Sequence, residues 1–195
     1  MNLHIAQKND ALKIAEIHKT EINKGFLSSL SISFLQKFYS ALIESDASFC
    51  IVAKEQERVI GFISGVTNLN TYYVYFFKKY FFHSAFILLP KIFNVSSLRK
   101  IFETLWYPLQ EKELPQAELL TMAVMREFQG KGIAGQLFLE FISEMKKRNI
   151  KRFKVMVGDE LKPAIHFYEK NGFTFLKNIH IHGNITSRVY IYDIT

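Results

Sequence analysis

The segment of residues 122–145, MAVMREFQGKGIAGQLFLEFISEM, restricts the fold more than any other part of the chain. An apolar run ends at Arg126, glycines follow at positions 130, 132 and 135, and an apolar stripe with helical spacing then begins. Backbone N–H groups at the start of a helix are unpaired and attract anions. Gly130 and Gly132 have no side chain to hold a phosphate away, and Lys131 adds positive charge. The segment predicts a strand, a phosphate-binding turn and a helix, although a tight turn without a ligand is equally expected from the glycines alone.

The spacing of these glycines differs from that of two other phosphate-binding motifs. No Lys-Ser or Lys-Thr pair follows the second glycine, as a P-loop requires. The turn also lies late in the chain and does not have the spacing of the dinucleotide fingerprint. The ligand must therefore be inferred from the rest of the sequence.

Hydrophobic periodicity predicts the element order βααββ, an insertion, and then βαβαββ. Single strands are expected at residues 3–6, 118–125 and 152–157, and hairpins at 48–66, turning near Gln56, and 173–194, turning at Gly183-Asn184. Helices are expected after Asn9 or Asp10, after Ser31 or Ser33, at residues 133–148, and from Pro163 to near Asn171-Gly172. The alternation of strands and helices in the second half indicates a mixed α/β fold around one sheet.

The composition is that of a globular chain, with 195 residues, 49% hydrophobic and 22% charged. This length suits a single domain at residues 1–195. One cysteine, Cys50, excludes an intramolecular disulfide, and the first residues lack the order of a signal peptide, so we expect a cytoplasmic protein. The net charge of +7 favours a polyanionic ligand or a membrane surface, and by itself it does not choose among a nucleotide cofactor, nucleic acid and lipid headgroups.

Two motifs together indicate a family. The segment MAVMREFQGKGIAGQL, residues 122–137, resembles the acetyl-CoA pyrophosphate-binding motif of the GNAT N-acetyltransferase superfamily. Further along, KPAIHFYEKNGF, residues 162–173, is similar to the second signature of that superfamily, a helix that closes on Gly-Phe. The predicted element order is also that of the family, and the strong part of the resemblance covers residues 118–173. It implies a GNAT acyl-CoA N-acyltransferase fold and acetyl-CoA as co-substrate.

The resemblance implies a role for each matching residue. The backbone of one strand would pair with the pantetheine arm of acetyl-CoA, at a splay between parallel strands, through Met122, Ala123 and Val124. The turn that follows would bind the pyrophosphate, through Gln129, Gly130, Lys131, Gly132, Ile133, Ala134 and Gly135. Tyr168 would act as the general acid for the departing CoA thiolate, and the alternative is that it packs on the apolar face of its helix.

Two positions depart from the family pattern. Members often have an asparagine that contacts the cofactor where this chain has Leu161, and some acetyltransferases of N-terminal residues have a glutamate base where it has Met156. These differences argue against a ribosomal-protein type of activity and leave cofactor binding intact.

No motif identifies the general base that takes a proton from the attacking amine. Glu118 is the first candidate, because it begins the strand and shares the alternation of Met122 and Val124, unless a bulge reverses that alternation. Asp159 and Glu160 are the alternatives. Each of these carboxylates is also expected simply as a solvated group at the end of a strand.

The remaining polar clusters point to no metal site. His180 and His182 share one face of a strand without an evident third ligand. A run of basic residues lies at the C-terminal end of one predicted helix: Lys146, Lys147, Arg148, Lys151, Arg152 and Lys154. These charges are expected to complement the helix dipole and to keep the protein in solution. The alternative is that they contact the 3′-phosphate of the cofactor or an acidic partner.

Residues 67–116 form an insertion between the third and fourth strands, rich in aromatic residues over 72–89 and with a helical apolar face over 98–109. A lid over the acceptor site, a dimer interface and an interfacial membrane anchor are the three alternatives, and we expect a lid or a dimer.

The sequence thus predicts an acetyl-CoA-dependent N-acetyltransferase that transfers directly to a primary amine of a small molecule. With the segment GFLSSLSISFLQKFY, residues 25–39, before the first hairpin, the chain also resembles acetyltransferases of bacterial surface-polysaccharide pathways, which implies amino sugars as acceptors. We expect a monomer or homodimer that binds neither nucleic acid nor membrane. The alternative is a non-catalytic acyl-CoA-binding or membrane-associated regulator that retains the cleft.

Overall fold

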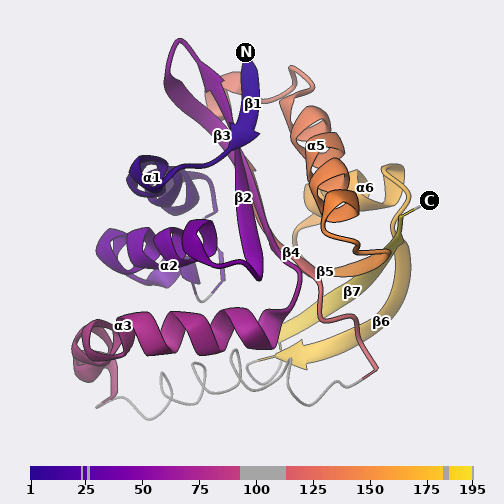
Figure 1. The fold of residues 1–195 in the computed structure, drawn as a ribbon. Helices are drawn as coiled ribbons and strands as arrows, with labels where there is room; N and C mark the ends of the chain where they lie inside the picture. Colours follow the sequence, from indigo (N-terminus) through magenta and orange to yellow (C-terminus); the bar gives the residue numbers. More distant parts are fainter. Residues whose placement is uncertain (23, 26, 93–112, 182–184, 195) are drawn as a thin grey trace.

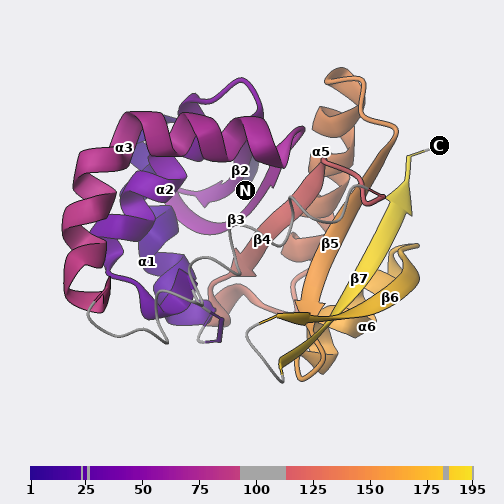
Figure 2. The ribbon, with the colours of Figure 1, turned by 90° about the horizontal axis from the view of Figure 1, so that it is seen from below.

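The computed structural model describes residues 1–22, 24–25, 27–92, 113–181 and 185–194, with the backbone alone at 81–92, 180–181 and 185. Seven strands form one sheet in the order β1-β2-β3-β4-β5-β7-β6 (Figures 1 and 2). Their bounds are β1 Asn2–Ile5, β2 Ser48–Glu55, β3 Arg58–Val66, β4 Glu118–Val124, β5 Arg152–Gly158, β6 Thr174–Ile181 and β7 Ile185–Asp193. Neighbouring strands are antiparallel except β4 and β5, which are parallel. The predicted mixed α/β fold is confirmed.

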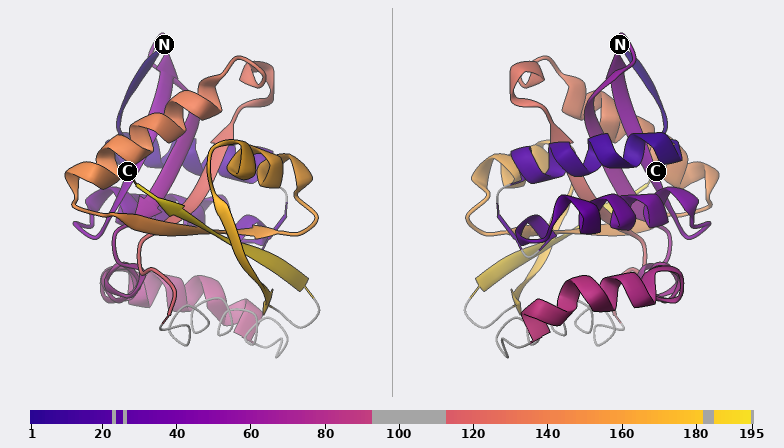
Figure 3. Two further views of the ribbon diagram at one scale, coloured as in Figure 1. Left: turned by 90° about the vertical axis from the view of Figure 1, so that its right-hand side faces the viewer. Right: turned by 90° about the vertical axis from the view of Figure 1, so that its left-hand side faces the viewer.

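Helices cover both faces of the sheet. Their bounds are α1 Ala11–Glu21, α2 Ile32–Glu44, α3 Leu69–Ile92, α5 Ile133–Lys147 and α6 Lys162–Lys170. Figure 3 shows α1, α2 and α3 stacked on one face and α5 and α6 on the other. Each layer has its own apolar core: one cluster lies between α1, α2 and the sheet, and another lies under α5 and α6.

The start of α2 is fixed by Ser31, one of the two predicted serines. Its hydroxyl accepts a hydrogen bond from the N–H of Phe34 at 3.2 Å, which satisfies one free donor of the first turn. Phe34, Leu35, Phe38 and Tyr39 then recur at helical spacing and are buried against the sheet. This packing holds Tyr39 at the centre of the first apolar cluster.

β4 contains a bulge at Leu120. Ser64 of β3 pairs with Thr121, but the next residue, Gly65, pairs with Leu119, so Leu120 has no partner of its own. The alternation of side chains is therefore reversed across this point. Leu119 packs under α5, whereas Leu120 packs in the cluster under α1 and α2.

The first part of the insertion is α3, which packs against α2. The ring of Phe38 lies 5.7 Å from that of Tyr72 and 5.9 Å from that of Phe76. The hydroxyl of Tyr72 donates to the carbonyl oxygen of Phe38 at 3.1 Å. Tyr72 and Phe76 of the insertion are therefore covered by α2 of the same protein chain.

The predicted apolar face over residues 98–109 and the predicted turn at Gly183-Asn184 lie outside the described residues. The division into one domain with an insertion at 67–116 stays a prediction.

Among the helices that the structure describes, none combines the length and the apolar content that crossing a bilayer would require.

Candidate active site

β4 and β5 pair over only two positions and then separate. The paired residues are Glu118 with Lys154 and Leu119 with Val155, after which β5 continues beside β7. The backbone of residues 122–124 pairs with β3 on one side and has no β5 partner on the other. Because a strand edge with free N–H and C=O groups can accept another extended chain, this opening suits a ligand that carries amides. It is the splay that the family resemblance implies.

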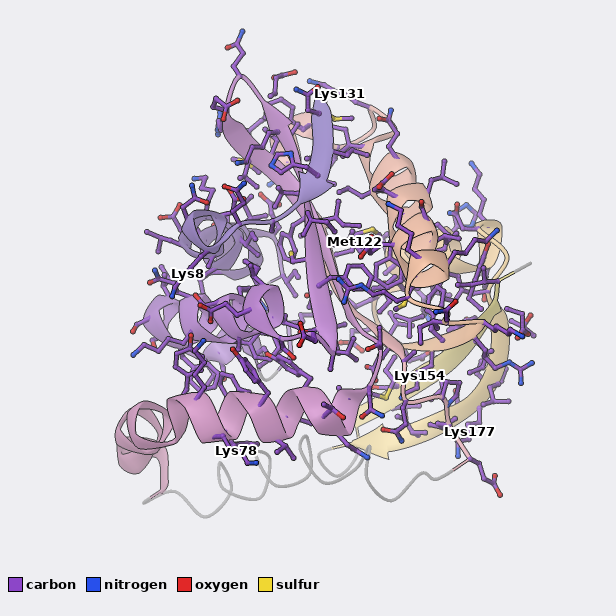
Figure 4. All side chains as sticks on the ribbon, viewed as in Figure 1. Lys8, Lys78, Met122, Lys131, Lys154 and Lys177 are labelled. Carbon is purple, nitrogen blue, oxygen red and sulfur yellow. The ribbon has the colours of Figure 1, made fainter. Side chains whose placement is uncertain are left out.

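The glycine turn follows β4 after one short 3-10 helix at Arg126–Phe128. Gly130 and Gly132 have φ values of +76° and +77°, in the left-handed region where a side chain would be strained. A Cβ atom at either position, or at Gly135, would meet nothing within 4 Å, so the space over the turn is open. Lys131 lies at the tip of this turn (Figure 4). The turn therefore combines backbone that only glycine readily adopts with room for a ligand.

Two side chains of the turn, those of Gln129 and Lys131, make contacts that hold it in place. The amide of Gln129 donates from Nε2 to the carbonyl oxygen of Val124 at 2.8 Å and so ties the turn to the end of β4. The ammonium of Lys131 lies 4.8 Å from the centre of the Phe128 ring. Gln129, a predicted cofactor-binding residue, thus has a structural contact through its side chain.

The N-terminus of α5 opens onto the same space. Gly132 is the N-cap residue, and no side chain caps this end of the helix. The first N–H groups of a helix have no partner within it, and the positive end of the helix dipole lies there. Ile133 and Ala134 begin this helix, so their backbone is available to an anion at the turn.

Tyr168 lies on α6 in the cluster that also includes Val124 and the half-buried Met122. Its side chain is buried, and its ring lies 5.1 Å from that of Phe173 and 5.7 Å from that of Phe167. Burial raises the pKa of the Tyr168 hydroxyl, so it keeps its proton at neutral pH. The position suits either a donor to a ligand at the splay or a packing residue.

Glu118 lies on the opposite face of β4 from Met122. The next pair of residues on β4 and β5, Leu119 and Val155, packs under α5, so Glu118 and Lys154 face the other way. The prediction that Glu118 shares the alternation of Met122 and Val124 is therefore wrong, and the bulge at Leu120 is the reason. Its role as base stays a prediction.

The surroundings of Glu118 are buried and charged. The ammonium of Lys154 lies 3.3 Å from Oε2, and Lys154 also donates to the carbonyl oxygen of Pro115. Burial raises the pKa of Glu118, and the nearby Lys154 partly opposes this. A raised pKa suits a base, but the ion pair holds the carboxylate in place.

The alternative carboxylates lie at the surface after β5. Asp159 accepts a hydrogen bond from Nε of Arg188 at 2.6 Å, and this contact lowers the pKa of Asp159. Glu160 is exposed. Asp159 is thus ionised and paired at the surface, and its role as an alternative base stays a prediction, as does that of Glu160.

One polar cluster was not predicted from the sequence. It joins Ser28, His18 of α1, Tyr39 of α2, and Thr121 of β4 with Ser64 of β3. Its members come from separate elements, so no sequence motif marks the cluster. The one signal in the sequence is that polar residues occupy positions where the pattern of each element is otherwise apolar.

Neither a reactive cysteine nor a metal site is found among the described residues. Cys50 is buried on β2, and burial raises its pKa, which disfavours a reactive thiolate. No group of three or more His, Cys, Asp or Glu residues in the described part of the chain could hold a metal ion. His180 and His182, for which the sequence indicates no third ligand, lie outside the described side chains.

A model of the "Acetyltransferase (GNAT) family" matches residues 19–173 of the chain. A search of curated proteins found no match.

Solved structures with the same fold cover the whole chain. An N-acetyltransferase from Staphylococcus aureus is 14% identical, with a TM-score of 0.64, and the match covers 100% of this chain and 98% of that one. The ribosomal-protein-S18-alanine N-acetyltransferase from Escherichia coli is 12% identical, with a TM-score of 0.63 and coverage of 100% and 94%. The protein yncA from Salmonella typhimurium, solved with its cofactor acetyl-CoA, is 14% identical, with a TM-score of 0.61 and coverage of 100% and 94%.

Proposed function

Because this chain belongs to the GNAT family of acetyltransferases, we propose that it transfers the acetyl group of acetyl-CoA directly to a primary amine of a small molecule. The observation that carries this proposal is the position of two features at one end of β4. The free strand edge at residues 122–124 is followed, after a short 3-10 helix, by the left-handed glycine turn at Gly130 and Gly132. An amide-bearing arm that ends in a pyrophosphate matches this arrangement.

In this proposal the chain binds acetyl-CoA mainly through backbone. The edge of β4 at Met122, Ala123 and Val124 offers to the amides of the pantetheine arm those backbone groups that point away from β3. The turn from Gly130 to Gly135 and the first N–H groups of α5 bind the pyrophosphate, where the helix dipole favours negative charge. Acetyl-CoA supplies an activated thioester, whose carbonyl carbon the amine attacks.

Tyr168 serves in this proposal as the donor to the sulfur of CoA. A thiolate leaves more readily when it receives a proton or a hydrogen bond. The burial of Tyr168 keeps its hydroxyl protonated and limits competition from water. Its place in the same apolar cluster as Met122 and Val124 supports a position near the thioester.

The proposed acceptors are small amines, with amino sugars as the first class to test. Met156 stands where some acetyltransferases of protein N-termini have a glutamate, which argues against that class of acceptor.

The proposed protein is a monomer or homodimer that works in the cytoplasm. We expect the purified protein to sediment as one of these two species and not to float with anionic liposomes; flotation that weakens with salt would favour a membrane contact instead.

The experiment that tests the proposal is a screen of primary amines with acetyl-CoA, in which release of the CoA thiol is followed. Amino sugars, polyamines and peptides with an N-terminal alanine form the panel. Amine-dependent thiol release is the expected result. Tight acetyl-CoA binding without thiol release by any amine would favour a non-catalytic acyl-CoA-binding protein.

A further inference from the structure

A continuous chain of hydrogen bonds crosses the apolar core between α1, α2 and the sheet. Thr121 Oγ1 lies 3.1 Å from Tyr39 Oη, which lies 2.5 Å from His18 Nδ1. His18 Nε2 lies 3.1 Å from Ser28 Oγ. At the other end Thr121 Oγ1 lies 2.6 Å from Ser64 Oγ. These groups are surrounded by the apolar residues of the first cluster, so each would be costly to bury without its partner.

The direction of these hydrogen bonds follows from one end. Ser28 donates its hydroxyl proton to the carbonyl oxygen of Lys24 at 3.1 Å, and a carbonyl can only accept. Ser28 must then accept from the Nε2–H of His18. A neutral His18 with its proton on Nε2 accepts at Nδ1, from the hydroxyl of Tyr39. Tyr39 in turn accepts from Thr121. Every donor therefore points from β4 toward Ser28.

The two ends of this chain differ in surroundings. Thr121 is partly exposed on β4 next to Met122, and its side chain faces Tyr39 of α2, on the opposite face of the sheet from the side chain of Met122. Tyr39 in the middle is fully buried. Ser28 is buried in the segment between α1 and α2, but Lys24 and Ser29 beside it are exposed. This chain of hydrogen bonds thus leads from the α2 face of β4, beside the splay, through the core to the protein surface.

The titratable groups of this hydrogen-bond chain, and those around it, are uncharged at neutral pH. Burial, and then the charge of Lys19, lowers the pKa of His18 to about 4, so the ring is uncharged at neutral pH. Burial raises the pKa of Tyr39, and the nearby Cys50 of β2 acts in the same direction. Tyr72 of α3 also faces Tyr39 and is itself held protonated by burial. A neutral chain can pass a proton along without keeping a charge in the core.

We propose that Thr121, Tyr39, His18 and Ser28 form a proton relay that carries the proton of the acceptor amine to the surface. The inference rests on the proposed acetyl transfer. As the N–C bond forms and the C–S bond breaks, the amine nitrogen gives its proton to Thr121. Thr121 passes its own proton to Tyr39, Tyr39 passes its proton to His18 Nδ1, and His18 Nε2 releases one to Ser28.

The proton balance of this step closes without a charged intermediate at the end. The hydroxyl of Ser28 turns from the carbonyl oxygen of Lys24 to pass its proton to water at the exposed segment, and each relay group has then gained one proton and lost one. His18 changes tautomer and returns when its proton redistributes. The leaving thiolate takes a proton from Tyr168 in the proposed function, and Tyr168 then regains a proton from water, which balances the proton released at Ser28.

Tyr39→Phe tests the relay, because it removes the central hydroxyl and keeps the ring. Tyr72→Phe is the matched control, since Tyr72 is buried in the same cluster but donates to a backbone carbonyl instead. We expect kcat of Tyr39→Phe to fall by roughly tenfold or more, with the affinity for acetyl-CoA unchanged and Tyr72→Phe close to the wild type. The loss should shrink as pH rises, because hydroxide can then take the proton of the amine directly.

A second pair of variants covers the case in which Tyr39→Phe fails to fold. Thr121→Val removes the hydroxyl and keeps the shape, whereas Thr121→Ser keeps the hydroxyl. We expect Thr121→Val to lose activity and Thr121→Ser to retain most of it. The relay is overturned if the wild type transfers acetyl groups and Tyr39→Phe or Thr121→Val matches it at every pH. A wild type that releases no thiol with any amine would instead count against the proposed function.

Discussion

The ammonium of Lys154 and the carboxylate of Glu118 form a buried ion pair on adjacent strands, with 3.3 Å between Nζ and Oε2. Both side chains are almost fully enclosed, with relative exposures of 2% and 5%. The pair lies one position before Leu119 and Val155, the last paired residues of β4 and β5. It therefore fixes the base of the opening that the proposed cofactor enters.

Glu118→Gln should destabilise the fold by about 3–5 kcal/mol, because it leaves a buried ammonium without its counter-charge. Urea unfolding of the variant measures this loss. The double variant Glu118→Leu with Lys154→Met removes both charges and should recover most of the stability. A loss below about 1 kcal/mol for Glu118→Gln would show that the pair is not buried as described.

The stability of the protein should fall in acid because of His18. Its pKa is lowered to about 4 in the folded protein from an ordinary value of 6.5, so the unfolded chain binds its proton first. The contribution is complete above pH 6.5 and is lost as pH falls toward about 4. We expect His18→Gln to lack up to about 3 kcal/mol of this pH dependence. Unfolding free energies of both proteins across this range provide the test, and identical pH profiles would contradict it.

Gly135→Glu separates ligand binding from turn stability. Gly135 is in the first turn of α5 with open space around it, so the new carboxylate should stabilise the helix end by about 0.3–1 kcal/mol. The same charge should repel the pyrophosphate and weaken acetyl-CoA binding at least tenfold, or about 1.4 kcal/mol. Gly135→Gln is the neutral control, and calorimetric titration measures both. Equal affinities for the two variants would place the phosphates elsewhere.

Tyr168→Phe removes a hydroxyl and keeps the buried ring. If this hydroxyl assists the leaving thiolate, kcat should fall by roughly 10²-fold, and the unfolding free energy should change by less than about 0.5 kcal/mol. Tyr192→Phe is a suitable control, because that ring packs on the same Phe173 at 5.0 Å and has no proposed role. Equal kcat values for the two variants would leave Tyr168 as a packing residue.

The parts of the site that could be predicted from the sequence are the local ones. The glycine turn depends on residues that are neighbours in the chain, and its left-handed positions at Gly130 and Gly132 are what such glycines indicate. The start of α2 at Ser31 is equally local. Each of these features is determined within a few residues, so a pattern in one segment is enough to find it.

The parts that could not be predicted depend on contacts between distant segments. The bulge at Leu120 arises from the pairing of β4 with β3, and it turns Glu118 to the other face. Tyr39 and Thr121 are 82 residues apart in the chain and meet only when α2 packs on the sheet. In the sequence Tyr39 fits the apolar face of a helix, and no neighbouring residue indicates that its hydroxyl takes part in a chain of hydrogen bonds.

The most direct measurement of the central claim follows the acetyl group itself. The protein is incubated with acetyl-CoA labelled in the acetyl group and with the best acceptor from the screen, and the products and the protein are then analysed by tandem mass spectrometry. Direct transfer predicts the label on the amine nitrogen of the acceptor and none on the protein. Label on a hydroxyl oxygen of the acceptor, or a labelled Cys50 on the way to product, would contradict the account.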